Sequence, residues 1–539
     1  MSNKSMIKIR QRSILGVSLL AFTLAGCSIT PEPLTTAEHE ERIKEDLGNL
    51  YTDQEKISEP ITMYEAMARA LKYNMDNRLK IMEEALSSQQ LTVAKMGLLP
   101  KLTANAGYSG RSEPDASNSE NLDTGVKSSS YSYSDDKNLI TADLGLSWNV
   151  LDFGLSYIRA QQVADRYMIT TERRRKVVHN IVQDVRASYW RALSAQRLLD
   201  KITPLQQQIT KALKSSEEIS RARLRPALET LQYRRNLLEA LRQLKMLGRE
   251  LVSSKIELAT LMNIQPGTEY TLADGSGDFS IPDVQIKLKE LETIALINRP
   301  ELREEAYQKR ISSKDVTRAM MGLIPGLEFN YNLNYDSNSF NNASNWNSWG
   351  ASISYNLLKS FTEGPAAIKQ AEDQLKVVET RRLALSMAVL SQVHIAYTRY
   401  QQVKDEFITT ADLHDVNTGI LRETRNAAQT QRQDDLRLIE AQLNSLLAEL
   451  QRDIGYAEML NAAGRIFVSV GADPLPDTVK DYSIKTLSKA LKARIEGWYA
   501  GRMSPADPSQ TINTSANEVD TKPEEPLSSG SSWFSWLKS

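Results

Sequence analysis

Ala94-Lys-Met-Gly-Leu-Leu-Pro-Lys-Leu102 recurs later in the same chain as Ala319-Met-Met-Gly-Leu-Ile-Pro-Gly-Leu327, and this repetition decides the fold. In each copy, Gly-Leu-Leu/Ile-Pro precedes a segment in which apolar and polar residues alternate. Two further matches follow in the same order. Three ordered matches predict two halves with one architecture, as is usual for internal repeats. The further matches pair Leu146-Ser-Trp-Asn-Val-Leu151 with Ile353-Ser-Tyr-Asn-Leu-Leu358, and Val185-Arg-Ala-Ser-Tyr-Trp-Arg191 with Val393-His-Ile-Ala-Tyr-Thr-Arg399.

Each half contains two segments of alternating apolar and polar residues, which predict β-strands with one apolar and one polar face. The connections within the two pairs, residues 110–138 and 336–348, are rich in Ser, Asn and Asp and are expected to be solvated loops. An ordinary half-buried sheet would show the same alternation as a lipid-facing one, so both interpretations stay open at this point. The expected strands are residues 102–109, 140–150, 327–336 and 349–357.

Most of the remaining sequence has apolar residues at helical spacing. Two very long helices are expected after the second and fourth strands, and each is followed by a returning helix. About 65 residues of helix would extend roughly 100 Å, and the narrow apolar stripes are typical of coiled coils. Pro204 is a candidate kink in the first long helix. The long helices are expected at 156–220 and 365–429, the returning helices at 227–262 and 436–463, and shorter helices at 61–73, 284–298 and 484–499.

The N-terminus has the features of a bacterial lipoprotein signal peptide. A basic segment is followed by an apolar stretch, residues 14–24, which is too short for a membrane-spanning helix. It ends in Leu24-Ala-Gly-Cys27, which resembles a lipobox and predicts lipidation of Cys27 as the mature N-terminus. Ser28 follows in place of the aspartate that retains lipoproteins in the inner membrane, so outer-membrane lipid is the expected anchor site. An ordinary secretory signal with a chance cysteine is the alternative.

The composition excludes several classes of function. The 66 basic and 67 acidic residues give a net charge of −1, and no basic block indicates nucleic-acid binding. The single cysteine excludes a disulfide framework and a cysteine-ligated structural zinc site. The four histidines lack metal-ligand spacing, and no nucleophile elbow or phosphate loop occurs. We therefore expect no cofactor, no metal and no enzymatic activity.

Two repeats of strand, strand, long helix and long helix behind a lipobox resemble the TolC-like outer-membrane factor family. The resemblance covers roughly residues 61–470, and it also rests on Glu440-Ala-Gln442 in the final long helix. It implies a mainly α fold with a small β part: repeated helical hairpins form a periplasmic α-barrel, and four strands per chain contribute to one trimeric β-barrel. It also implies a homotrimer that works with a periplasmic adaptor (membrane fusion) protein and an inner-membrane pump.

The number of strands favours oligomerisation independently of the family resemblance. Four strands cannot close around a lumen, because small barrels need about eight strands, and open strand edges are not tolerated in lipid. Two chains would supply eight strands and three would supply twelve. Only the larger barrel leaves room for an aqueous passage, and the resemblance favours three copies.

The two helical turns differ from those of the family, which carry a glycine at each turn and an acidic gate just beyond it. Neither turn contains glycine here, and the family's paired aspartates fall nearest Arg437 and Glu440. Asp434 and Asp435 are possible substitutes one turn earlier. These charges could also simply solvate the end of a coiled coil. The gate candidates are Glu229, Asp434, Asp435 and Glu440, with Arg223, Arg225 and Arg437 as partners across subunits.

The leading functional hypothesis is a passive trimeric export duct of a tripartite efflux or type I secretion system. The main alternative is a periplasmic lipid-anchored coiled-coil adaptor or structural protein with no pore, and a lipid-anchored periplasmic enzyme is the third. The expected division of the chain is a signal peptide (1–26), an anchor and linker (27–60), a first repeat (61–274), a second repeat (275–470), a C-terminal helical segment (471–502) and a disordered tail (503–539).

Overall fold

The protein is described by a computed structural model, which covers residues 32–52, 54–222, 226–273, 279–430, 435–476, 479 and 481–503. The expected signal peptide with Cys27 and most of the C-terminal tail lie outside these residues. The chain divides into two compact units, Met1–Glu55 and Lys56–Ser539.

Among the described residues of the first unit there is one helix, α2 (Thr36–Leu50), in a region where the sequence predicted only an anchor and linker. Its start is specified by a capping box. The Thr35 hydroxyl accepts a hydrogen bond from the Glu38 backbone N–H at 3.3 Å, and Glu38 Oε2 accepts one from the Thr35 backbone N–H at 2.6 Å. These two bonds satisfy backbone donors that a helix N-terminus otherwise leaves unpaired.

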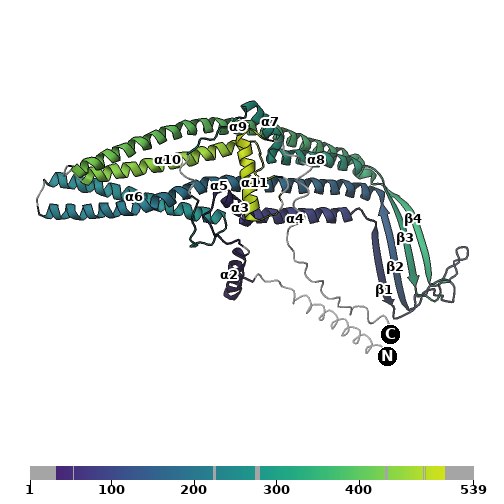
Figure 1. Ribbon diagram of the computed structural model, residues 1–539. Coiled ribbons are helices and arrows are strands. Elements are labelled where there is room, and N and C mark those ends of the chain that lie inside the picture. Colours follow the sequence, from purple (N-terminus) through teal and green to yellow (C-terminus); the bar gives the residue numbers. More distant parts are fainter. Residues whose placement is uncertain are drawn as a thin grey trace. The chain divides into compact units, whose positions relative to one another are not determined.

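The second unit has the predicted mainly α fold with one four-stranded sheet, so the expected fold class is confirmed. The sheet lies at one end of the long helices, and the paired long helices end together at the other (Figure 1). Its helices are α3 (Met63–Tyr73), α4 (Met75–Met96), α5 (Val150–Arg221), α6 (Ala227–Leu261), α7 (Leu288–Asn298), α8 (Pro300–Met321), α9 (Leu357–Thr430), α10 (Asp435–Ser469) and α11 (Ile484–Tyr499).

The sheet is antiparallel throughout, with the strand order β1-β2-β3-β4. The fourth strand begins four residues before the expected 349–357 and ends earlier, because Leu357 already starts α9. The expected loop 336–348 is correspondingly too long. The strands are β1 (Lys101–Gly110), β2 (Asn138–Asn149), β3 (Gly326–Asp336) and β4 (Asn345–Ser354).

The repeated Gly-Leu-Leu/Ile-Pro sequence ends a helix and starts a strand in both halves. Gly97 is the C-cap of α4, and its N–H donates to the carbonyl of Val93 at 3.3 Å. Gly322 is the C-cap of α8, and its N–H donates to the carbonyl of Arg318 at 3.0 Å. The proline that follows cannot continue a helix. The helices that precede these turns, α4 and α8, were not predicted from the sequence.

The long helices extend beyond their predicted bounds. Helix α5 begins at Val150 directly after β2, six residues before the predicted start, and it continues through Pro204. Helix α9 begins at Leu357, eight residues before the predicted start. Each strand pair is therefore joined to its long helix with almost no intervening loop.

Two clusters of buried side chains hold the helices together. In the first, α3, α7 and α11 pack on the middle of the long helices through Met67, Leu291 and Leu491. In the second, Leu244 of α6 and Ile439 of α10 pack against α5. The extended helices thus share a continuous apolar contact region along α5, while the sheet has no comparable cluster among the described residues.

None of the described helices combines the length and the hydropathy that a membrane-spanning helix needs.

Candidate channel-forming surfaces

One face of the sheet is mostly apolar, and it is interrupted at the start of β4 by Asn345 and Asn347. The register pairs Leu144 with Leu333 and Leu146 with Tyr331, so the apolar residues of neighbouring strands lie side by side. Their side chains are largely exposed, for example 44% for Phe329 and 75% for Ile353. The predicted apolar face is therefore confirmed as one surface. It is formed by Leu102, Ala104, Ala106, Tyr108, Ile140, Ala142, Leu144, Leu146, Trp148, Leu327, Phe329, Tyr331, Leu333, Tyr335, Trp349, Ala351 and Ile353.

The opposite face carries polar side chains that bond to one another across the strands. Asn105 Nδ2 donates to Asp143 Oδ2 at 2.9 Å, and Asn334 Nδ2 donates to Ser348 Oγ at 3.0 Å. A Cβ at Gly145 would lie 2.5 Å from the Asn332 side-chain oxygen, so glycine leaves room for this amide. Because β4 begins earlier than predicted, Trp346 also lies on this face, opposite Asn334.

The sheet has two free edges within the described chain. Strands β1 and β4 are the outer strands, and each pairs on one side only. An open edge presents unpaired backbone N–H and C=O groups, which require a partner wherever water is absent. A four-stranded sheet with one apolar face and two open edges is thus suited to join other copies side by side.

The described gate candidates lie near the start of α6 or of α10, and these two helix ends are at the same end of the unit (Figure 1). Glu229 is exposed in the first turn of α6, and Arg437 and Glu440 are exposed near the start of α10. Asp435 is the first residue of α10. Arg223, Arg225 and Asp434 lie outside the described residues. The fold therefore brings the described candidates Glu229, Asp435, Arg437 and Glu440 to one end, and a gate remains a prediction.

A buried network of ion pairs, which the sequence analysis missed, joins α5 to α8 and to the segment after α10. Asp473 accepts hydrogen bonds from Arg175 Nε at 3.1 Å and Arg175 Nη2 at 2.8 Å. Glu172 is buried between Arg175 and Arg303, whose Nε lies 2.9 Å from its carboxylate. The run of charged residues Glu172-Arg-Arg-Arg175 could have indicated this network, but the sequence does not show which of these charges are buried.

Burial alone would raise the pKa of the Asp473 carboxyl. The hydrogen bond with His179 and the positive charge of Arg175 outweigh this effect and hold the pKa well below its usual range. The carboxylate is therefore ionised in the folded protein at neutral pH. Among the residues that the structure describes, no group of three or more His, Cys, Asp or Glu side chains is arranged to hold a metal ion.

Residues 69–263 match the family of outer membrane efflux proteins. No curated protein matches the chain. Its fold is similar to that of a membrane protein from Pseudomonas aeruginosa, with a TM-score of 0.59 and 15% identity over 76% of this chain and 92% of that one.

Two proteins described as channels, the second of them as an outer-membrane channel, are also similar. CusC has a TM-score of 0.58 and 15% identity, covering 78% of this chain and 96% of that chain. The open state of the Neisseria gonorrhoeae MtrE channel has a TM-score of 0.55 and 16% identity, covering 77% and 94%. The match over residues 69–263 and the shared fold confirm the resemblance of this chain to the TolC-like outer-membrane channel family.

Proposed function

We propose that this protein is an outer-membrane export channel, in which three copies form one passive duct. The observation that carries the proposal is the sheet, whose exposed apolar face and hydrogen-bonded polar face lie on opposite sides of the same four strands. In a closed assembly the apolar face would contact lipid, and the polar face would line water.

The open edges require the copies to join head to tail, and the barrel size favours three. Three chains supply twelve strands when the outer edge of β4 in one copy pairs with β1 in the next. Barrel diameter grows with strand number, and eight strands leave space only for side chains or one small ligand, so the twelve-stranded barrel is the better fit to an aqueous duct. Cyclic symmetry uses the same two edges in every copy. The long helices would extend from this barrel into the periplasm.

The proposal also assigns a location and partners. The lipobox predicts a lipid anchor on Cys27 in the outer membrane. A duct without a nucleotide site or other energy source depends on a pump, so an inner-membrane pump and a periplasmic adaptor are the expected partners. Efflux and type I secretion differ in cargo. Loss of the gene should raise sensitivity to small toxic compounds in the first case, and abolish release of a partner-encoded protein in the second.

The direct test is purification of the full chain from outer membranes, followed by mass measurement and planar-bilayer recording. We expect a trimer that conducts ions. A parallel preparation that carries Leu144→Arg on the apolar face serves as the assembly-deficient control. A stable monomer that supports no conductance would refute the duct, and would favour a coiled-coil lipoprotein with no pore.

A further inference from the structure

The polar face of the sheet carries more acidic than basic side chains. Asp143, Glu328 and Asp336 lie on it together with one basic residue, Lys101. Each copy therefore adds an excess of two acidic residues (three minus one) to this face. A water-lined surface with an excess of one charge sign concentrates solutes of the opposite sign, so this face attracts cations.

Trp346 is the only aromatic residue on the polar face of the four strands, all of which the structure describes in full. Its side chain is 44% exposed. Trp349, three positions later in the same strand, lies on the apolar face opposite Tyr331, where contact with lipid would explain an aromatic ring. Lipid does not explain Trp346. An indole ring that faces water offers an electron-rich surface on which a cation can stack.

Trp346 lies in one cross-strand row with Asn334, Asp143 and Asn105. Asn105 Nδ2 donates to Asp143 Oδ2 at 2.9 Å, and this bond orients the carboxylate. Asp143 and Trp346 are two strands apart, which corresponds to roughly 10 Å at about 4.8 Å between neighbouring strands. A small organic cation can therefore contact the indole ring at one end while its charge lies near the carboxylate.

The edge of the sheet beside Trp346 leaves the indole ring accessible. Strand β4 is an outer strand, and in the proposed assembly it pairs with β1 of the next copy. Apart from Lys101, the side chains on the polar face of β1 are too small to cover an indole ring. They are Thr103, Asn105, Gly107 and Ser109.

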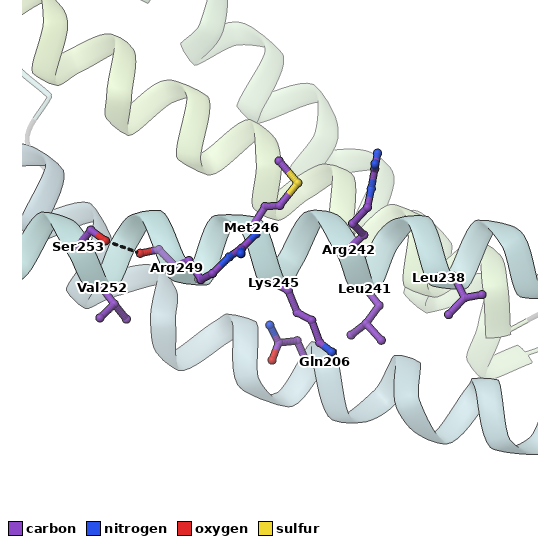
Figure 2. A pocket seen from close by; sticks show the side chains of 10 residues that line it. Gln206, Leu238, Leu241, Arg242, Lys245, Met246, Arg249, Val252 and Ser253 are labelled. Carbon is purple, nitrogen blue, oxygen red and sulfur yellow. Dashed lines mark hydrogen bonds between the residues drawn. The ribbon is translucent and has the colours of Figure 1, made fainter.

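The helical part of the molecule has a hollow of the opposite charge. Figure 2 shows this hollow along α6, where Arg242, Lys245 and Arg249 line it and no acidic side chain does. A cation would be repelled there. Attraction of cations is therefore a property of the polar sheet face and is not shared by this hollow.

We propose that Trp346 and Asp143 bind organic cations, such as quaternary ammonium and aromatic cations, on the polar face of the sheet. The inference rests on the proposed function, because the duct makes this face the wall along which solutes pass. A single carboxylate beside an indole favours an organic cation over a metal ion, which needs several oxygen ligands. A weak site on the wall retains the solute briefly and still lets it leave, as conduction requires.

The first test measures binding by fluorescence in the full-length protein, purified in detergent. The probe is benzylpyridinium, an aromatic cation that quenches indole fluorescence on contact. We expect a saturable component of quenching that disappears in Trp346→Gln and persists in Trp349→Leu, the matched control on the opposite face of the same strand. Asp143→Asn should raise the probe concentration for half-maximal quenching roughly two- to five-fold, as expected for the loss of an exposed charge pair.

Block of the ionic current provides a second measurement. In planar bilayers, benzylpyridinium should block the potassium current through the wild type and through Trp349→Leu at similar concentrations. Trp346→Gln should require a concentration roughly two- to five-fold higher, as expected for the loss of an exposed cation–π contact. Benzenesulfonate, an aromatic anion, should block none of them. All variants should form the same amount of detergent-resistant oligomer, because each replacement suits the face on which it lies.

The outcomes separate this inference from the proposed function. Quenching that is unchanged in Trp346→Gln, or displacement of the probe by equal concentrations of neutral benzyl alcohol, overturns the cation site, and a protein that still conducts leaves the duct intact. A protein that does not conduct refutes the duct, but selective quenching of Trp346 would still support the site, because fluorescence requires no pore. A protein with neither conductance nor selective quenching overturns both.

Discussion

Arg175 on α5 binds the carboxylate of Asp473 through two hydrogen bonds, although the two residues are 298 positions apart in the chain. The geometry is bidentate, which makes it one of the stronger ion-pair arrangements in proteins. His179 Nε2 lies 2.9 Å from the same carboxylate. This contact joins the segment after α10, in the second repeat, to α5 of the first repeat.

Replacing Asp473 with alanine should destabilise the fold. Arg175 is buried and would lose its bidentate partner, and breaking a buried pair from one side costs about 3 kcal/mol or more. Asp200 is an exposed acid on the same helix as Arg175, so Asp200→Asn should change stability by less than about 0.5 kcal/mol. Thermal unfolding followed by circular dichroism measures both. Equal melting temperatures for the two variants would contradict a stabilising role for this pair.

The same ion pair should make the protein sensitive to acid. The folded-state pKa of Asp473 is lowered, so its contribution to stability is complete above the unfolded pKa of 3.8 and is lost as the pH falls from there toward the lower folded value. Stability should therefore decrease below about pH 4, and Asp473→Asn should reduce the slope of this decrease. Denaturant titrations between neutral pH and pH 3 measure the slope. If the unfolding free energy of the variant falls with pH as steeply as that of the wild type, other carboxyl groups cause the acid sensitivity.

Arginine on the apolar sheet face should impair membrane assembly, whereas arginine on the polar face should not. Leu144→Arg and Phe329→Arg would place a charge against lipid, at a cost of about 2–4 kcal/mol near the bilayer midplane. Asn330→Arg is the matched control, because it is adjacent to Phe329 and lies on the polar face opposite Ser147. The fraction of heat-resistant oligomer in outer membranes is the measurement. Similar losses for all three variants would identify an ordinary buried sheet.

The sequence predicted the repeat, the alternating strands and the long helical pairs because all three depend on local periodicity. It failed at α4 and α8, whose apolar spacing is weak and whose ends depend on caps such as Asn74 and Gly97. It also failed at β4, where Trp346 and Ser348 are strand residues in a segment with loop-like composition. The Arg175–Asp473 contact depends on chain packing over 298 positions, and no local pattern reports it.

Gly464 on α10 is predicted to be intolerant of a side chain. A Cβ at this position would overlap Nη1 of Arg186, a buried residue of α5, so that the guanidinium would have to move within the interior. Gly464→Ala should therefore destabilise the protein by about 1–3 kcal/mol, as overpacked interiors do. Gly248→Ala on α6 has open space around it and should be neutral or stabilising by up to about 1 kcal/mol. Thermal unfolding gives the melting temperatures of both variants. A Gly464→Ala variant more stable than the wild type would show that Arg186 can move without a cost in stability.

Cys27 is expected to be the acylated N-terminus of the mature protein. Several acyl chains on one residue would hold the protein stably at the membrane, whereas one chain binds only marginally. Cys27→Ser should lose metabolic labelling with palmitate. The wild-type chain should fractionate with the outer membrane, as Ser28 predicts. Persistent labelling of the variant, or inner-membrane retention of the wild type, would refute this assignment.

The charged residues near the helical turns are expected to keep the duct closed at rest. Three-fold symmetry would place three copies of each residue around a narrowing axis, where like charges repel. Closure then requires neutralisation by arginines of the neighbouring copy or by bound cations. An exposed pair contributes only about 0–1 kcal/mol, although symmetry repeats each contact three times. Such a weak closure is one that an adaptor can open when it binds.

Neutralising the arginines should therefore raise the resting conductance in planar bilayers, because the acidic ring would lose its partners. Neutralising the acids should instead weaken block by added cations, because the ring itself would be removed. Arg399 lies on α9 well away from its C-terminal end, so Arg399→Gln is the control and should leave resting conductance and cation block unchanged. If conductance and cation block are unaltered in every variant, these side chains only solvate the helix ends. The substitutions are Arg223→Gln, Arg225→Gln and Arg437→Gln for the first set, and Glu229→Gln, Asp434→Asn, Asp435→Asn and Glu440→Gln for the second.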